Sequence, residues 1–344
     1  MTITTNMEKI LIIQTAFIGD AILTLPLLQK LKNIYPESVV DIVSNPVTSE
    51  IFSASPYVNE VIILDKRNEH KSISSAYKFS KKIKERNYTK LFSPHRSLRT
   101  SLIVLLSDIK ETYGFDSSSF MHIYKYLIPY NYQAHEVQRN LDLIGFKYDE
   151  QSWKIKPQLN ISSSSKEKIE KFIKENNLGD KIIAISPGSI WNTKQYPLEY
   201  YEKVIATLNL KGYKVILIGG EKDKVVCNEL ASKNNNIISC SGNFSILESI
   251  ELLKNVKLLI SNDSAPTHMG MCADIPVLTL YCSTSYEFGF YPYNEKSSYL
   301  SYDDLFCKPC GIHGYDKCPI STFDCGYLLK PEIVTSKIDK MLND

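Results

Sequence analysis

The chain contains no apolar run that approaches the ~20 residues needed for a membrane-spanning helix, and its opening residues, MTITTNMEK, have no apolar signal-peptide core. It also has little net charge, since 40 Lys and Arg residues face 38 Asp and Glu residues and leave a formal charge of +2. Proteins that bind nucleic acid normally carry a large basic excess. We therefore expect a cytoplasmic protein with no nucleic-acid partner.

Two nucleotide-binding motifs are also missing. No G-x-G-x-x-G follows the first strand expected in either half of the chain, and no G-x-x-x-x-G-K-[ST] occurs anywhere in it. The sequence therefore disfavours a dinucleotide-dependent dehydrogenase and a P-loop enzyme.

Arginine and cysteine are each absent from one half of the chain. The five arginines lie between Arg67 and Arg139, and the eight cysteines begin at Cys227. The two halves therefore have different tasks. Residues 66–90 hold nine Lys or Arg side chains against two acids, which suits an anionic surface. A solvated helix face is the alternative, and for these lysines it is preferred.

The order of apolar and amphipathic segments predicts an α/β fold with two domains. A chain of 344 residues that is 43% hydrophobic can bury two cores. Strands that alternate with helices indicate parallel sheets covered on both faces. We assign residues 1–160 to one domain and residues 161–344 to the other, with Ser162 capping the first helix of the second. The expected strands are 10–14, 39–43, 61–64 and 90–93, then 182–186, 214–218, 237–239, 258–260 and 277–281, and the expected helices of the first half are 21–34, 72–86, 97–106 and 135–146.

Asp20 lies where the first expected strand passes into its helix. Gly19 permits a tight turn there, and open parallel sheets bind ligands at the carboxyl ends of their strands. Two interpretations stay open: Asp20 faces the ligand crevice, or it only caps its helix. The helix N-terminus argues against a catalytic base, because it stabilises the carboxylate anion and makes it a weaker base.

Two strand-end loops of the second half suit a phosphate and a ribose. Ser186, Gly188 and Lys194 combine a Gly-containing turn with an ammonium group, which suits phosphate. At Gly220 a ligand can approach the backbone, and Glu221 can accept hydrogen bonds from both ribose hydroxyls. Each loop is weak evidence alone, and a turn with a surface lysine is the simpler explanation of the first.

The segment 258–284, LLISNDSAPTHMGMCADIPVLTLYCST, is the most informative in the chain. A buried strand leads into a helix opened by an Ala-Pro pair, so Asp263 and Ser264 stand at a helix N-terminus, where unpaired N–H groups favour an anion. His268 follows one turn later on the same side. The alternative is that Asp263 caps the helix and His268 packs against the sheet. The four loops together predict a nucleotide diphosphate site in the second domain.

Six stretches of the chain occur in a distinctive order. They are ILIIQTAFIGDAILTLPLLQKLKNIYP, RSLRTSL, ISPGSIWNTKQYPLEYY, LIGGEKD, NDSAPTHMGMCADIPVLTLYCST and the terminal CKPC with two later cysteines. In this order they resemble glycosyltransferase family 9, the ADP-heptose:lipopolysaccharide heptosyltransferases. The resemblance implies the GT-B fold, in which two Rossmann-like domains face each other across a central cleft.

The resemblance also implies roles for the residues of both domains. Lys194 matches the family's donor-phosphate lysine and Glu221 its ribose-binding glutamate. Asp20 matches the aspartate proposed as general base, which deprotonates the acceptor hydroxyl for inverting attack on the anomeric carbon. Arg96 and Arg99 match an arginine-bearing helix start in the acceptor domain. The donor motif, in which Ala265 replaces the usual glycine, is matched by Asp263, Ser264 and His268. Enzymes of this kind generally need no catalytic metal.

Four cysteines lie in one C-terminal segment rich in Gly and Pro: Cys307, Cys310, Cys318 and Cys325. Because a reducing cytoplasm disfavours disulfides, four closely spaced thiols suggest a tetrahedral, structural zinc or iron site. The resemblance points the same way, since family members that heptosylate autotransporter proteins bind iron through four cysteines. Reduced thiols without a metal are the alternative.

We therefore expect an inverting glycosyltransferase that moves heptose from ADP-heptose to an anionic lipopolysaccharide inner-core acceptor. Peripheral contact with the cytoplasmic face of the inner membrane is an open extension of this hypothesis. A protein-directed heptosyltransferase is the close enzymatic alternative, and an epimerase of the same fold is another. The alternative from a different class is a non-catalytic nucleotide-sugar-binding module.

Overall fold

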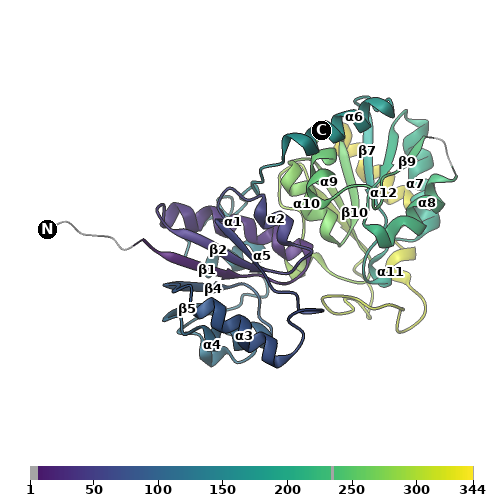
Figure 1. Ribbon diagram of the computed structural model, residues 1–344. Coiled ribbons are helices and arrows are strands. Elements are labelled where there is room, and N and C mark those ends of the chain that lie inside the picture. The colour runs from purple at the N-terminus through teal and green to yellow at the C-terminus, as the bar shows by residue number, and fades with distance from the viewer. Residues whose placement is uncertain (1–6, 234–235, 344) are drawn as a thin grey trace. The chain divides into compact units, whose positions relative to one another are not determined.

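The computed structural model describes residues 7–233 and 236–343 (Figure 1). The chain divides into two compact units, Met1–Asn160 and Ile161–Asp344. Each unit contains one six-stranded sheet in which all neighbouring strands are parallel. The predicted α/β class is therefore confirmed. Among the described residues, no helix combines the length and apolar character that a membrane span requires.

The first unit is built around β1, whose residues Ile10 to Ile13 are fully buried. Such a continuous apolar run is typical of a parallel strand covered on both faces. Strand order is β3-β2-β1-β4-β5-β6, so the chain reverses direction across the sheet between β1 and β4. The strands are β1 (Lys9–Ile13), β2 (Val39–Ser44), β3 (Glu60–Ile63), β4 (Lys90–Ser93), β5 (Glu111–Phe115) and β6 (Tyr126–Ile128).

Helices cover both faces of this sheet. Figure 1 shows α3 and α4 together on one face and α1, α2 and α5 on the other. Asn140 on α5 donates its side-chain amide to the Leu23 carbonyl of α1 over 3.0 Å, which fixes these two helices side by side. The helices are α1 (Ile18–Ile34), α2 (Ser49–Ser53), α3 (Ile73–Lys84), α4 (Leu98–Ser107) and α5 (Glu136–Asp142), with a 3-10 turn η1 (Met121–Ile123).

The second unit repeats this plan with the strand order β12-β11-β10-β7-β8-β9. Its core packs the buried apolar faces of α7 and α12 against the central strands. The strands are β7 (Ile182–Ser186), β8 (Lys214–Leu217), β9 (Ile237–Ser239), β10 (Leu258–Asn262), β11 (Val277–Tyr281) and β12 (Ser298–Ser301). The helices are α6 (Ser163–Glu175), α7 (Leu198–Leu210), α8 (Lys224–Ala231), α9 (Ile246–Leu253), α10 (Ala265–Ala273), α11 (Asp324–Tyr327) and α12 (Pro331–Asn343), with 3-10 turns η2 (Asn192–Lys194), η3 (Glu221–Asp223) and η4 (Tyr286–Phe288).

All nine expected strands are present, whereas three edge or near-edge strands and the short α2 were not expected. β6 has only three residues, two of which are exposed, and β12 is half-buried along its length. β5, with the sequence ETYGF, mixes polar residues and glycine with aromatic ones. Such strands lack the apolar run by which a central parallel strand is found.

Candidate active site

In the first unit, Asp20 lies in the first turn of α1, which follows the carboxyl end of β1 after the loop of residues 14–17. Its Oδ2 accepts a hydrogen bond from the backbone N–H of Phe17 over 3.2 Å. Asp20 therefore helps to cap its helix, as the capping interpretation predicted. The cap uses one carboxylate oxygen, so it does not exclude a role in proton transfer.

The surroundings of Asp20 reverse the expected effect of the helix N-terminus. Burial raises the pKa of Asp20 most, the nearby Glu136 carboxylate adds to this shift, and the resulting pKa is about 7. The backbone hydrogen bonds and the Arg96 guanidinium lower it, but they are the weaker influences. The prediction that the helix terminus makes Asp20 a weak base is therefore wrong for this site, because desolvation outweighs the local stabilisation of the anion.

Glu136 is the centre of a buried polar cluster that the sequence did not reveal. It opens α5 with 6% of its surface exposed. Its Oε2 lies 2.9 Å from Nη1 of Arg139 and 3.3 Å from the Tyr130 hydroxyl. Burial raises the pKa of Glu136 and the Arg139 cation opposes this shift. Because a guanidinium lies in direct contact, we assign the negative charge of this cluster to Glu136.

The two predicted acceptor arginines have different surroundings. The Arg96 guanidinium carbon lies 3.9 Å from the ring centroid of Tyr130, and its Nη1 donates to the Ser117 hydroxyl over 3.0 Å. This places Arg96 beside the cluster of Glu136 and near Asp20. Arg99 instead donates to the backbone carbonyls of residues 70 and 71, over 2.6 and 3.0 Å. Arg99 thus has the structural contacts of the alternative interpretation.

In the second unit, Lys194 and Asp263 form an ion pair with Nζ 2.7 Å from Oδ2. The Thr284 hydroxyl donates to the same Oδ2 over 2.7 Å. Both charged side chains are only 11% exposed. Lys194 was expected on a loop, but it ends the 3-10 turn η2 and is buried. The structure therefore brings two of the predicted donor residues into direct contact.

His268 lies close to this pair, on α10. It is 4% exposed, and its Nδ1 is a buried atom without a hydrogen-bond partner in the part of the chain that the structure describes. Burial lowers the pKa of His268 to about 4, with Asp263 opposing the shift and Lys194 adding to it. The imidazole is therefore neutral at pH 7 and can accept or donate one further hydrogen bond.

Asn262, which the sequence analysis missed, holds the strand-end loops in place. Its Nδ2 donates to the carbonyl of Pro187 over 2.8 Å, and its Oδ1 accepts from the Tyr196 backbone N–H over 3.0 Å and the Tyr201 hydroxyl over 2.9 Å. An asparagine that ends an apolar, fully buried strand was the available signal. A buried amide must satisfy its hydrogen bonds, and here it does so across neighbouring loops.

The side chain of Asp223 packs so closely against Gly188 and Gly219 that a larger residue would not fit at either position. A Cβ added at Gly188 would lie 2.0 Å from Oδ1 of Asp223, and one added at Gly219 would lie 2.7 Å from its Cβ. Asp223 also accepts the N–H of Gly220 over 2.8 Å. The space at Gly188 is therefore occupied by a side chain of the protein. The phosphate role of the Gly188 turn and the close approach of a ligand at Gly220 stay predictions.

The other predicted donor residues lie at the same edge of the sheet with different exposure. Ser186 ends β7 and is buried, and Ser264 is the N-cap of α10 with an extended backbone. The Glu221 side chain is 74% exposed, with its Oε2 2.8 Å from Nζ of Lys224. Glu221 is therefore accessible to a ribose, and its carboxylate pairs with Lys224.

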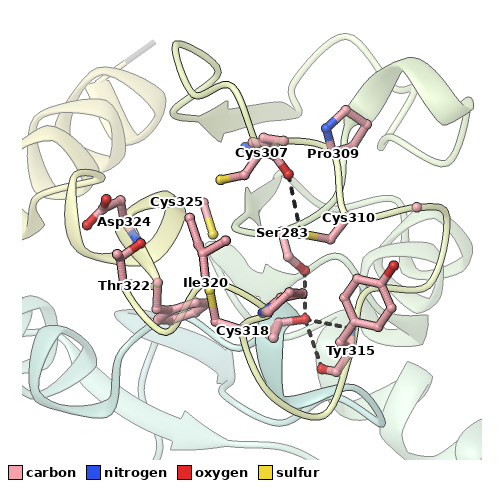
Figure 2. Close-up of a pocket in the computed structure, with 15 residues that line it drawn as sticks. Ser283, Cys307, Pro309, Cys310, Tyr315, Cys318, Ile320, Thr322, Asp324 and Cys325 are labelled. Carbon is pink, nitrogen blue, oxygen red and sulfur yellow. Dashed lines mark hydrogen bonds between the residues drawn. The ribbon is translucent and has the colours of Figure 1, made fainter.

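The four C-terminal cysteines, Cys307, Cys310, Cys318 and Cys325, line one pocket of about 210 Å³. Figure 2 shows their side chains gathered around it. Burial raises the pKa of the Cys318 thiol, but the backbone N–H groups of residues 320–323 together outweigh it and lower this pKa, which suits a thiolate ligand. Among the described residues, however, no group of three or more His, Cys, Asp or Glu side chains is already arranged to hold a metal ion. The other four cysteines are buried.

Comparison with known proteins gives three findings. Residues 76–314 match the model of glycosyltransferase family 9 (heptosyltransferase). The chain is 25% identical over 341 residues to lipooligosaccharide heptosyltransferase 2 of Campylobacter jejuni subsp. jejuni serotype O:6, over 97% of this chain and 99% of that protein. Its fold is similar to that of Escherichia coli ADP-heptose LPS heptosyltransferase II, with a TM-score of 0.78, 21% identity and coverage of 97% and 98% of the two chains.

A more distant likeness is found with a further solved structure. The bacterial iron-containing dodecameric glycosyltransferase TibC from enterotoxigenic E. coli H10407 is similar in fold with a TM-score of 0.62. The two chains are 13% identical, with 98% of this chain and 79% of that one covered. At this identity the likeness extends to the fold alone.

Proposed function

The chain belongs to glycosyltransferase family 9 (heptosyltransferase), as its motifs predicted, and from this we propose that it is an inverting glycosyltransferase that transfers heptose from ADP-heptose to a lipopolysaccharide inner-core acceptor. Residues 161–344 bind the donor and residues 1–160 bind the acceptor. The alternatives of a protein acceptor, an epimerase and a binding module are not favoured, because the similar proteins named above include lipopolysaccharide and lipooligosaccharide heptosyltransferases.

The observation that carries the proposal is the buried pair of Lys194 and Asp263 at the start of α10. In the reaction the bond between the anomeric carbon and the diphosphate breaks, and its electron pair leaves with ADP. Lys194 and the N-terminus of α10 supply positive charge where this negative charge develops. The neutral His268 can add a hydrogen bond. These groups stabilise the leaving diphosphate, so the proposed chemical step uses no cofactor.

Asp20 accepts the proton of the acceptor hydroxyl as its oxygen forms the new bond to the anomeric carbon. A carboxyl group with a pKa of about 7 is partly ionised at neutral pH and is a stronger base than an ordinary aspartate. The negative charge of the buried Glu136 adds to the effect of burial and helps to keep the pKa of Asp20 raised. Arg96, beside the same cluster, binds a carboxylate or phosphate of the acceptor.

The acceptor also suggests where the protein acts. An inner-core acceptor is an anionic glycolipid, so we propose a peripheral position at the cytoplasmic face of the inner membrane. Four exposed lysines of α3 are compatible with such a surface, but they do not distinguish it from the solvated helix face that is preferred for them. They are Lys78, Lys81, Lys82 and Lys84.

The cysteine pocket is proposed to hold one structural zinc or iron ion. Four thiols around a single pocket provide the ligand number and type that a closed tetrahedral site needs. Ligation requires the four side chains to draw together, because they do not yet form a ligand set. The ion would fix the fold of the C-terminal segment and take no part in glycosyl transfer.

The function is tested with purified protein, ADP-heptose and a lipopolysaccharide acceptor truncated before its heptose residues. We expect ADP release and an acceptor heavier by one heptose, measured by mass spectrometry. Asp20→Asn is the matched control, since asparagine caps a helix as well as aspartate but is no base. It should bind the donor and lose about two to four orders of magnitude in turnover.

The alternatives give different results in the same assay. Donor isomerisation without an acceptor would identify an epimerase, and transfer only to a protein acceptor would identify the protein-directed enzyme. Donor binding without any turnover would favour the binding module. Near-normal turnover of Asp20→Asn would remove Asp20 from the chemistry.

A further inference from the structure

The segment that carries the cysteines is attached to the turn that carries Lys194. The backbone N–H of Thr193 donates to the carbonyl of Tyr315 over 3.0 Å, and the N–H of Tyr315 donates to the Thr193 hydroxyl over 2.8 Å. The N–H of Cys310 donates to the carbonyl of Ser283 over 2.7 Å. Figure 2 shows Ser283 and Tyr315 joined through this network. The residues between Cys310 and Tyr315 are thus held at the donor site.

Gly314 shows how close this approach is. Its φ is +75°, a conformation that favours glycine. A Cβ added there would lie 2.8 Å from the Ser283 hydroxyl, 2.9 Å from the Thr193 hydroxyl and 3.5 Å from Cγ of Lys194. The backbone beside His313 is therefore packed directly against the Lys194 side chain, and only glycine fits without displacement.

His313 itself is exposed, and its ring stacks on that of Trp191 with centroids 6.0 Å apart and an angle of 25° between the planes. Partial burial lowers the pKa of His313, and the charge of Lys194 lowers it further while Asp263 opposes the shift. The imidazole is thus electrostatically coupled to the donor ion pair. A stacked ring is also oriented, so its N–H points in a limited set of directions.

We propose that His313 is an additional donor-binding residue, which the cysteine-bearing segment supplies to the diphosphate beside Lys194. The inference rests on the proposed function and extends it. Because Asp263 already neutralises the Lys194 ammonium, a diphosphate needs further donors, and a neutral imidazole contributes one N–H. The simpler alternative is that His313 only packs against Trp191.

The test uses ADP and adenosine as probes in calorimetric titrations of the full chain. His313→Ala should weaken ADP binding about tenfold, the loss of one hydrogen bond to a charged group, while adenosine binding stays unchanged. His313→Gln keeps an N–H donor and should recover part of the affinity. Ile312→Ala is the matched control, because Ile312 is the exposed neighbour and should bind as wild type. Gly314→Ala, which displaces the segment without removing the imidazole, should also weaken ADP binding.

The outcomes separate this inference from the proposed function. If wild type binds ADP and Lys194→Ala weakens it but His313→Ala does not, the role of His313 is overturned and the donor site stands. Equal losses for ADP and adenosine in His313→Ala would overturn it too, because they would place His313 at the base and not at the phosphates. Wild-type protein that binds no ADP would overturn both.

Discussion

Lys194 and Asp263 neutralise each other across 2.7 Å, and Thr284 holds the same carboxylate oxygen. The pair connects the turn after β7 with the start of α10. A diphosphate that binds here must therefore share the Lys194 ammonium with Asp263. The carboxylate sets the direction of the ammonium and moderates its charge toward any such diphosphate.

The first prediction concerns this donor site. Lys194→Ala should weaken ADP binding by about 1.5–3 kcal/mol, because it removes a charge-assisted contact and leaves the Asp263 carboxylate facing the phosphates. Glu221→Ala should cost less, since its side chain is 74% exposed. Calorimetric titration measures the ADP affinity of both variants, and Lys222→Ala provides a control from η3, the turn that contains Glu221. Wild-type affinity in both donor variants would show that the nucleotide binds elsewhere.

The second prediction concerns the pH dependence of turnover. Asp20 must be ionised to accept a proton, and its pKa is raised to about 7. The value of kcat/KM should therefore fall about tenfold per pH unit below this point and level off above it. Glu136→Gln removes a negative charge beside Asp20 and leaves the Arg96 and Arg139 cations in place, so the fall should move to lower pH. An unchanged profile in Glu136→Gln would exclude electrostatic tuning of Asp20 by Glu136.

The central strands and the position of Asp263 and His268 in the fold could be predicted from the sequence because their signals are local. Buried parallel strands are apolar runs, and the start of α10 follows one of them directly, so Asp263 and His268 could be placed at the carboxyl edge of the sheet. The network through Asn262 could not be predicted in the same way. Its partners are Pro187 just after β7, Tyr196 between η2 and α7, and Tyr201 in α7, which only the folded sheet brings together.

The properties of Asp20 were not predictable for a related reason. The sequence shows its helix terminus, which lowers a carboxyl pKa, but it does not show the burial or Glu136, which raise it. Asp20 and Glu136 become neighbours only because α1 and α5 pack side by side. In the same way, the carbonyls that bind Arg99 lie in a distant part of the sequence.

The third prediction separates the two arginines. Arg96→Lys keeps the charge but removes the guanidinium fork, so it should raise the KM for an anionic acceptor about tenfold and leave donor binding unchanged. Arg99→Lys should instead lower the free energy of unfolding by about 1–3 kcal/mol, because it loses hydrogen bonds to two backbone carbonyls. Steady-state kinetics and denaturant unfolding distinguish the two effects. Wild-type acceptor kinetics in a folded Arg96→Lys variant would rule out an arginine clamp at this position.

The last prediction concerns Cys307, Cys310, Cys318 and Cys325. If they share one ion, elemental analysis should give about one zinc or iron per chain, and Cys318→Ser should release it. Cys240→Ala, a buried thiol outside the pocket, should retain the ion.

Chelation of that ion should lower the Tm before it affects turnover, because four protein thiolates leave a tetrahedral ion no open position for substrate or water. As the segment loosens, the contacts of Tyr315 with Thr193 should weaken, so the KM for the donor should rise while kcat is still unchanged. A metal-free protein with full stability and four freely titrating thiols would overturn the metal site. It would leave the donor and acceptor assignments untouched, because neither Lys194 nor Asp20 depends on the ion for its charge.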